Sequence, residues 1–110
     1  MSKAVVTGYS FQLDVEGENE TIDVVRMGET RQDGTFDLGA DVWAIKRSGG
    51  LCLSRERKWD HHPLPSNRDD AWKQEHRWPL TEALLVAEEE ADRLADKINA
   101  YLDRLKDEQA

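Results

Sequence analysis

Residues 80–105 read LTEALLVAEEEADRLADKINAYLDRL, and this stretch decides the fold. Apolar side chains recur in it at alternating intervals of four and three residues: Leu80, Leu84, Ala87, Ala91, Leu94, Ile98, Tyr101 and Leu105. This spacing lines one face of an α-helix, because about 3.6 residues complete a turn. No glycine or proline follows Pro79 in the sequence. We therefore expect one long helix over residues 80–107, about 40 Å in length.

The apolar stripe of this helix changes width along its length. Its first turns also carry Leu85 and Val86, which makes a stripe wide enough to pack on a sheet. The later turns narrow to a seam that is typical of coiled coils, formed by Leu94, Ile98, Tyr101 and Leu105. The end of the helix is thus expected to contact a second copy of the chain, or another partner, through this seam. The alternative is a monomer in which the end of the helix is a frayed tail.

The N-terminal residues alternate between two faces, as a half-buried strand requires. Apolar side chains and one threonine occupy one face: Val5, Thr7, Tyr9, Phe11, Leu13 and Val15. The polar residues 16–20 predict a turn, and residues 21–27 predict a second strand. A loop this short can return only an antiparallel partner, so the two strands should form a hairpin.

A second hairpin is predicted further along the chain. Residues 42–45 form a third strand candidate and residues 51–53 begin a fourth. Gly49 and Gly50 lie between them and supply the positive φ angles of a tight turn. Residues 36–41 fit either a strand or a loop.

Regular patterning stops at residues 60–79, which contain all three prolines and all three histidines. Pro63 and Pro65 disfavour helix and strand around them. Residues 66–69 read SNRD and match a helix-start signal, in which a serine oxygen accepts a backbone N–H and an acid lies in the first turn. A short helix near residues 67–76 is therefore expected.

These elements predict a single α+β domain, a size that 110 residues fit well. A three- to four-stranded antiparallel sheet should occupy about residues 3–59, a loop and short helix residues 60–79, and the long helix residues 80–107. The helix is expected to pack through Leu80, Leu84, Ala87, Ala91 and Leu94. Its partners on the sheet should be Tyr9, Phe11, Leu13, Ile22 and Trp43.

Charge is distributed unevenly along the chain. The 15 Lys+Arg and 23 Asp+Glu give a formal net charge of -8. Residues 1–30 carry six acids and two basic residues, and residues 81–110 carry nine and four, whereas the middle is nearly neutral. Broad contact with a nucleic-acid backbone requires clustered cations, so direct binding of nucleic acid is disfavoured.

Basic residues nevertheless gather near the second hairpin. If the fourth strand continued, Arg55, Arg57 and Trp59 would share one face, as a surface for a nucleic-acid strand would require. Pairing of these cations with the acidic helix inside the protein is the simpler interpretation.

The acidic residues suggest a docking surface. Carboxylates held on a rigid surface can imitate phosphates and occupy a basic groove of another protein. The candidates lie in the first turn and on the helix: Glu16, Glu18, Glu20, Glu88, Glu89, Glu90 and Asp92. The competing interpretation is that these charges are only solvated.

Few residues suggest catalysis. Asp60, His61, His62 and His76 contain metal-binding side chains, but adjacent histidines in an extended segment point in opposite directions. Cys52 is the only cysteine, which excludes an internal disulfide, and its apolar neighbours favour a structural thiol. No phosphate-binding loop or dinucleotide fingerprint is present. We expect a non-enzymatic protein without a cofactor.

No apolar run approaches the roughly 20 residues of a membrane span, and the N-terminus lacks the apolar core of a signal peptide. The sequence therefore predicts a cytoplasmic protein that does not enter the membrane.

The middle of the chain resembles small uncharacterised proteins of phages and other mobile elements. The resemblance covers about residues 43–95 and rests on GLCL at residues 50–53, Lys58-Trp59, PSNRDD at residues 65–70, Arg77-Trp78 and the acidic, alanine-rich helix. It implies a β-meander, a P-S-x-R-D segment and a closing helix. It also implies a context in which such proteins bind and block host machinery, as anti-CRISPR and other anti-defence proteins do.

The leading hypothesis is a non-enzymatic inhibitor that binds a basic surface on a host complex that handles nucleic acid. One alternative is a small metal-dependent nuclease or hydrolase that uses Asp60, His61, His62 and His76. Another is a structural homodimer assembled through the C-terminal helix.

Overall fold

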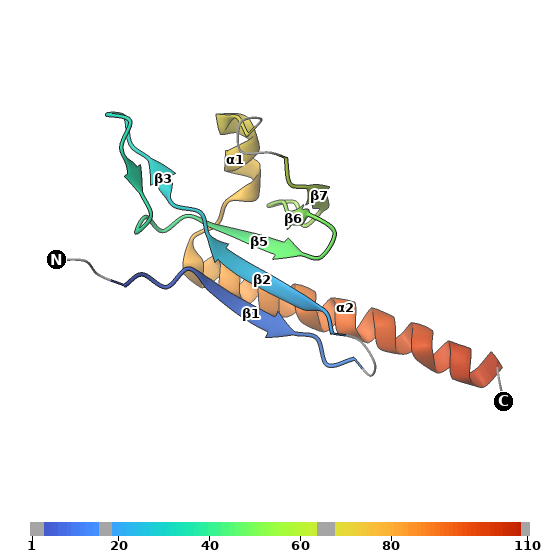
Figure 1. The fold of residues 1–110 in the computed structure, drawn as a ribbon. Helices are drawn as coiled ribbons and strands as arrows, with labels where there is room; N and C mark the ends of the chain where they lie inside the picture. Colours follow the sequence, from blue (N-terminus) through green and yellow to red (C-terminus); the bar gives the residue numbers. More distant parts are fainter. Residues whose placement is uncertain (1–3, 16–18, 64–67, 109–110) are drawn as a thin grey trace.

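The computed structural model describes residues 4–15, 19–63 and 68–108. Over these ranges the main sheet has five antiparallel strands: β1 (Gly8–Gln12), β2 (Thr21–Arg26), β5 (Trp43–Arg47), β6 (Leu51–Leu53) and β7 (Trp59–His61). They lie side by side in this order, and a long helix follows the sheet (Figure 1). The predicted α+β class is confirmed, but the sheet has five strands where three or four were expected.

The two predicted hairpins, β1–β2 and β5–β6, lie side by side and make up four of the five strands. Phe11 of β1 pairs with Ile22 of β2, and Val24 of β2 pairs with Ile45 of β5. The turn between β5 and β6 uses the glycine pair as expected, with φ angles of 85° at Gly49 and 72° at Gly50. Side-chain alternation then places the apolar residues of neighbouring strands on one face.

The fourth strand ends earlier than the sequence pattern indicated. After β6 the chain turns over residues 54–58, where the Lys58 amide donates to the Ser54 hydroxyl at 3.1 Å and the Ser54 amide donates to the Lys58 carbonyl at 2.8 Å. Arg57 adopts a φ of 66° in this turn. The expectation that Arg55, Arg57 and Trp59 share a strand face is therefore wrong, because a tight turn separates the arginines from β7.

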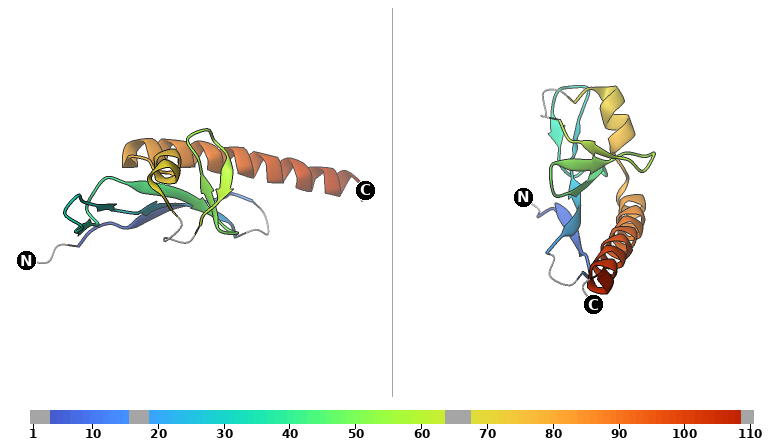
Figure 2. Two further views of the ribbon diagram at one scale, coloured as in Figure 1. Left: turned by 90° about the horizontal axis from the view of Figure 1, so that it is seen from above. Right: turned by 90° about the vertical axis from the view of Figure 1, so that its right-hand side faces the viewer.

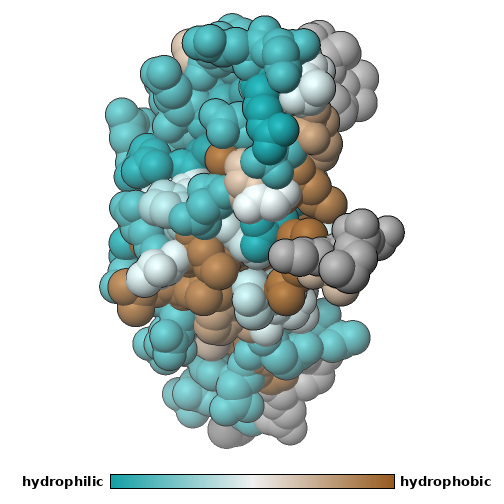
Figure 3. Space-filling model, turned by 90° about the vertical axis from the view of Figure 1, so that its left-hand side faces the viewer, coloured by the Kyte–Doolittle hydropathy of each residue, from teal (hydrophilic) through white to brown (hydrophobic). Residues whose placement is uncertain are grey.

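A small two-stranded ribbon projects from the main sheet between β2 and β5 (Figure 1). It consists of β3 (Glu29–Thr30) and β4 (Phe36–Asp37). Gly28 begins the excursion with a φ of 72°, and a Cβ atom there would lie 2.6 Å from the Phe36 ring. Glycine is thus required both for the backbone conformation and for the close packing of Phe36. On the side of the molecule that carries the ribbon, exposed hydrophobic residues form several patches with hydrophilic residues between them (Figure 3).

Helix α2 (Leu80–Glu108) packs along the sheet and continues beyond the ends of its strands (Figure 2). Its buried residues are Ala83, Val86, Ala87, Glu90 and Ala91. Leu80, Leu84 and Leu94, which were expected to make the principal contacts, are only partly buried. The buried stripe is therefore rotated toward the small residues, which let the helix approach the sheet closely.

The core beneath α2 contains most of the predicted sheet partners. Leu13, Ile22 and Trp43 are buried, and Phe11 packs against them. Tyr9 is the exception at 39% exposed, with its ring centroid 5.8 Å from that of Trp43. Strand β1 is at the edge of the sheet, so Tyr9 has a neighbouring strand on one side only.

Helix α1 (Asp70–His76) is the short helix expected near residues 67–76. Its N-cap is Asp69, whose carboxylate accepts the Trp72 amide at 2.7 Å. The predicted serine cap, Ser66, lies outside the described residues. The helix lies against Cys52 and Asp60, which are register partners on one sheet face. Leu53, the next residue in β6, belongs to the core beneath α2, so alternation puts the two helices on different faces.

Candidate functional site

Two of the predicted acidic residues of the first turn, Glu16 and Glu18, lie outside the described residues. The third, Glu20, precedes β2 and contacts the β5–β6 turn. Its carboxylate lies 3.0 Å from Nη2 of Arg47 and accepts the Ser48 hydroxyl at 3.1 Å. The side chain is only 18% exposed. Glu20 therefore ties two turns of the sheet together and offers little surface to a partner.

Glu89 and Glu90 of α2 bind Arg57, which lies in the turn at residues 54–58. One Arg57 nitrogen lies 3.0 Å from Glu89 and the other 3.1 Å from Glu90, which also lies 3.5 Å from Arg93. Glu90 is 4% exposed, and a buried carboxylate requires such a partner. Burial opposes the charge on Arg57, but the hydrogen bonds that its guanidinium donates to both glutamates raise its pKa. Internal pairing of basic residues with the acidic helix is confirmed here.

The remaining predicted acids, Glu88 and Asp92, are exposed on the outer side of α2. Helical spacing places three further exposed carboxylates on the same side, so that the row comprises Glu88, Asp92, Asp96, Asp103 and Asp107. We call this row the acidic face. Within the described ranges none of the five makes an ion pair within 4.0 Å. The first three are four residues apart, or about 6 Å along the helix axis.

The structure divides the predicted dimer seam into an inner and an outer part. Leu94 and Ile98 pack against the protein's own core, and the Asn99 amide donates to the Asp14 carbonyl at 3.3 Å. Tyr101 is 53% exposed and Leu105 is half-buried. Only the outer two residues are thus available to a partner, because the sheet reaches further along α2 than the sequence pattern indicated.

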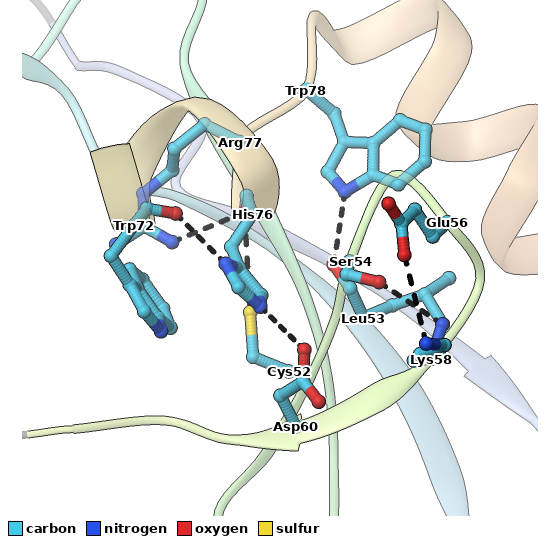
Figure 4. Close-up of polar contacts among 10 residues, drawn as sticks. All are labelled: Cys52, Leu53, Ser54, Glu56, Lys58, Asp60, Trp72, His76, Arg77 and Trp78. Atoms are coloured by element: carbon cyan, nitrogen blue, oxygen red, sulfur yellow. Dashed lines mark hydrogen bonds and ion pairs between the residues drawn. The ribbon is translucent and has the colours of Figure 1, made fainter. Parts of the chain in front are cut away.

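The histidines of the proposed metal cluster have different surroundings. Figure 4 shows His76 between Asp60 and Trp72, with Nε2 2.8 Å from the Asp60 carboxylate and Nδ1 2.8 Å from the Trp72 carbonyl oxygen. The imidazole is buried and its ring stacks on Trp72 at 4.1 Å. A carbonyl oxygen can only accept, so Nδ1 donates to it. Both ring nitrogens are therefore occupied.

The other two histidines do not join this pair. His62 stacks on Trp72 at 5.1 Å, and its Nε2 lies 3.4 Å from Arg77. His61 is exposed. In the part of the chain that the structure describes, no three histidine, cysteine or acidic side chains are arranged to hold a metal ion. Of the four residues proposed to bind a metal, Asp60 and His76 therefore form a structural hydrogen-bonded pair, and His61 and His62 are not part of it.

His62 lies in positive surroundings. Burial lowers its pKa to about 4, and repulsion from Arg68, Lys46, Arg77 and His76 adds to this effect. The ring is consequently neutral at physiological pH, and its Nε2 can accept a hydrogen bond from Arg77.

Cys52 is fully buried, with its sulfur 4.0 Å from the His76 carbonyl oxygen. Burial raises the pKa of the thiol, and the nearby Arg77 and Lys46 only partly oppose this. The protonated thiol is a poor nucleophile, so Cys52 fits a structural role as expected.

Among the described residues, no helix is both long enough and apolar enough to cross a membrane. Comparison of the chain with protein-family models, with curated proteins and with solved structures found no match.

Proposed function

We propose that this protein is a non-enzymatic inhibitor whose acidic face binds a basic surface on a host complex that handles nucleic acid. The observation that carries the proposal is the row of five exposed carboxylates on α2, none of which is paired within the described residues. The phage-borne, anti-CRISPR-like context comes from the sequence resemblance alone.

The rigidity of α2 supports this proposal. Ala83, Ala87 and Ala91 anchor the first half of the helix in the core, so the backbone that carries Glu88 and Asp92 has a fixed position. Binding then requires no further ordering of the α2 backbone. Rows of like charge on one face also accelerate encounter with an oppositely charged surface.

The contacts of the predicted acids decide which of them we assign to docking. Glu20 and Glu90 are largely buried and held by Arg47 and Arg57, so reversing their charge would disturb the fold as well as the surface. Glu89 is exposed but already paired with Arg57. Glu88 and Asp92 remain from the predicted set, and Asp96, Asp103 and Asp107 extend it. Spacings of four and seven residues, which keep side chains on one side of a helix, were the sequence signal for this extension.

The test is protection of a plasmid in cells whose defence system targets that plasmid. The unaltered protein should restore transformation. The triple variant Glu88→Lys/Asp92→Lys/Asp96→Lys should lose at least about tenfold of this protection, since a single close ion pair at an interface contributes about 1.5 kcal/mol or more. The matched control changes the same charge at exposed acids elsewhere, Asp14→Lys/Glu56→Lys/Glu75→Lys, and should protect fully. Absence of protection by the unaltered protein, or full protection by the triple variant, would contradict the proposal.

A second candidate function is assembly of a homodimer through the end of α2. The observation in its favour is that Tyr101 is 53% exposed on a helix that continues past the sheet (Figure 2). Light scattering should then give twice the chain mass, and Tyr101→Asp/Leu105→Asp should give the monomer mass. Tyr101→Phe is the control and should remain dimeric. A monomer mass for the unaltered protein at all concentrations would exclude this function.

A further inference from the structure

A pocket of about 580 Å³ lies where the β3–β4 ribbon and the segment leading into α1 face each other. Its volume falls in the range of small-molecule sites, which is roughly 300–1,000 Å³. The charged residues that line it are Arg68, Lys73, Arg77, Glu29 and Asp70. It lies away from the acidic face, so it requires an explanation of its own.

The three cations of the pocket have no acidic partner within 4.0 Å among the residues that the structure describes. Arg77 is the most notable of them because it is only 8% exposed. Its guanidinium donates to the His76 carbonyl at 3.2 Å, lies 3.4 Å from His62 and stacks over Trp72 at 5.0 Å. The partner groups in these contacts carry no charge, whereas a buried cation is stabilised most by an anion.

The electrostatics of the neighbouring groups support an excess of positive charge here. Burial, and after it repulsion from Arg68, lowers the pKa of Lys46. Repulsion from Arg68, Lys46 and Arg77 adds to the effect of burial in lowering the pKa of His62. Local positive potential of this kind attracts an anion with several acceptor oxygens, because arginine offers a planar fork of donors.

The rest of the pocket suits an aromatic ligand with hydroxyl or amino groups. The Phe36 ring rests on Gly28 and is still 60% exposed, so its outer face is free for stacking. Glu29 and Asp70 line the same pocket and can accept hydrogen bonds from hydroxyl or amino groups. Cations alone would suit any anion. The combination of cations, an exposed aromatic ring and two carboxylates fits a ligand that has an anionic group, an aromatic ring and hydrogen-bond donors.

We infer that this pocket binds a nucleoside monophosphate. The phosphate contacts Arg68, Lys73 and Arg77, the base stacks on Phe36, and the ribose or base donors reach Glu29 and Asp70. This inference is independent of the proposed docking function.

Titration calorimetry with the full chain tests the inference, using the four nucleoside 5′-monophosphates, adenosine and inorganic phosphate as probes. At least one monophosphate should bind at least about tenfold more tightly than both adenosine and phosphate. Lys73→Gln and Arg68→Gln should each weaken that binding about tenfold, the equivalent of about 1.4 kcal/mol. Lys97→Gln, an equal change of charge at an exposed position of α2, should have no effect.

Lys73 is exposed and its side chain makes no hydrogen bond within the described ranges, so its variant keeps the test valid if Arg68→Gln misfolds. Phe36→Leu should reduce binding of the nucleotide and leave binding of phosphate unchanged. The inference is overturned if no monophosphate binds, if phosphate or adenosine binds as tightly as the nucleotide, or if Lys73→Gln binds like the unaltered protein.

Discussion

Glu90 shows how a single residue of the acidic run can have a structural role. It lies among exposed carboxylates in the sequence, yet its side chain is buried and held by Arg57. Arg57 is 33 residues away, and its side chain reaches α2 from a tight turn. Local pattern cannot show such a partner, because only the fold brings the turn and the helix together. The sequence therefore identified the acidic helix but not which acids remain free.

Replacing Arg57 should be costly because it leaves the Glu90 carboxylate buried with only the more distant Arg93. We expect Arg57→Met to reduce the free energy of unfolding by about 2 kcal/mol. Glu89→Gln removes an exposed partner of the same arginine and should cost about 0.5 kcal/mol or less. Urea denaturation measures both variants. Equal losses would show that Glu90 does not depend on Arg57.

His62 should make stability depend on pH. Its pKa in the folded protein, about 4, lies below its ordinary value of 6.5, so between these values the unfolded chain binds the proton more readily. The free energy of unfolding should therefore fall as the pH is lowered from 6.5 toward 4. His62→Gln should flatten this part of the pH profile, whereas His61→Gln, at an exposed position, should keep it. Coincident profiles for His62→Gln and the unaltered protein in denaturation experiments would disprove the assignment.

At the scale of elements, segments with a periodic pattern or a clear turn or helix-start signal were predictable, and short segments without such a signal were not. The spacing of apolar residues located α2, and alternation and the glycine pair located β1, β2, β5 and β6. Strand β7 has three residues and the ribbon strands two each, too few for any periodicity. Such strands form because a neighbouring turn returns the chain beside an existing edge, as the Ser54–Lys58 contacts do for β7.

The rotation of the buried stripe of α2 has a measurable consequence. Ala87 is fully buried against the sheet, so Ala87→Leu should overpack the core and lower the free energy of unfolding by about 2 kcal/mol. Leu85, which a simple apolar count assigns to the same stripe, is 60% exposed. Leu85→Ala should change stability by about 0.5 kcal/mol or less. Thermal or urea unfolding distinguishes the two, and the reverse order of effects would contradict the observed packing.

At the scale of the whole molecule, the net charge of -8 is the sum over two surface regions of opposite charge and a remainder of mixed charge. The acidic face lies along α2, whereas the cations of the pocket lie near α1 and the β3–β4 ribbon (Figure 1). The acidic face was partly predictable because its residues follow helical periodicity. The pocket was not predictable, because Phe36 precedes Arg68 and Arg77 by more than 30 residues and meets them only in the fold.

We propose that the acidic face binds a basic partner, and the most direct test is the rate at which the protein associates with the defence complex of a strain in which it restores plasmid transformation. The rate constant, measured at increasing salt, should fall steeply for the unaltered protein. Glu88→Lys/Asp92→Lys/Asp96→Lys should bind at least about tenfold more slowly at low salt, while Asp14→Lys/Glu56→Lys/Glu75→Lys should bind at the original rate. A rate that does not depend on salt, or that is equal for the two triple variants, would contradict the claim.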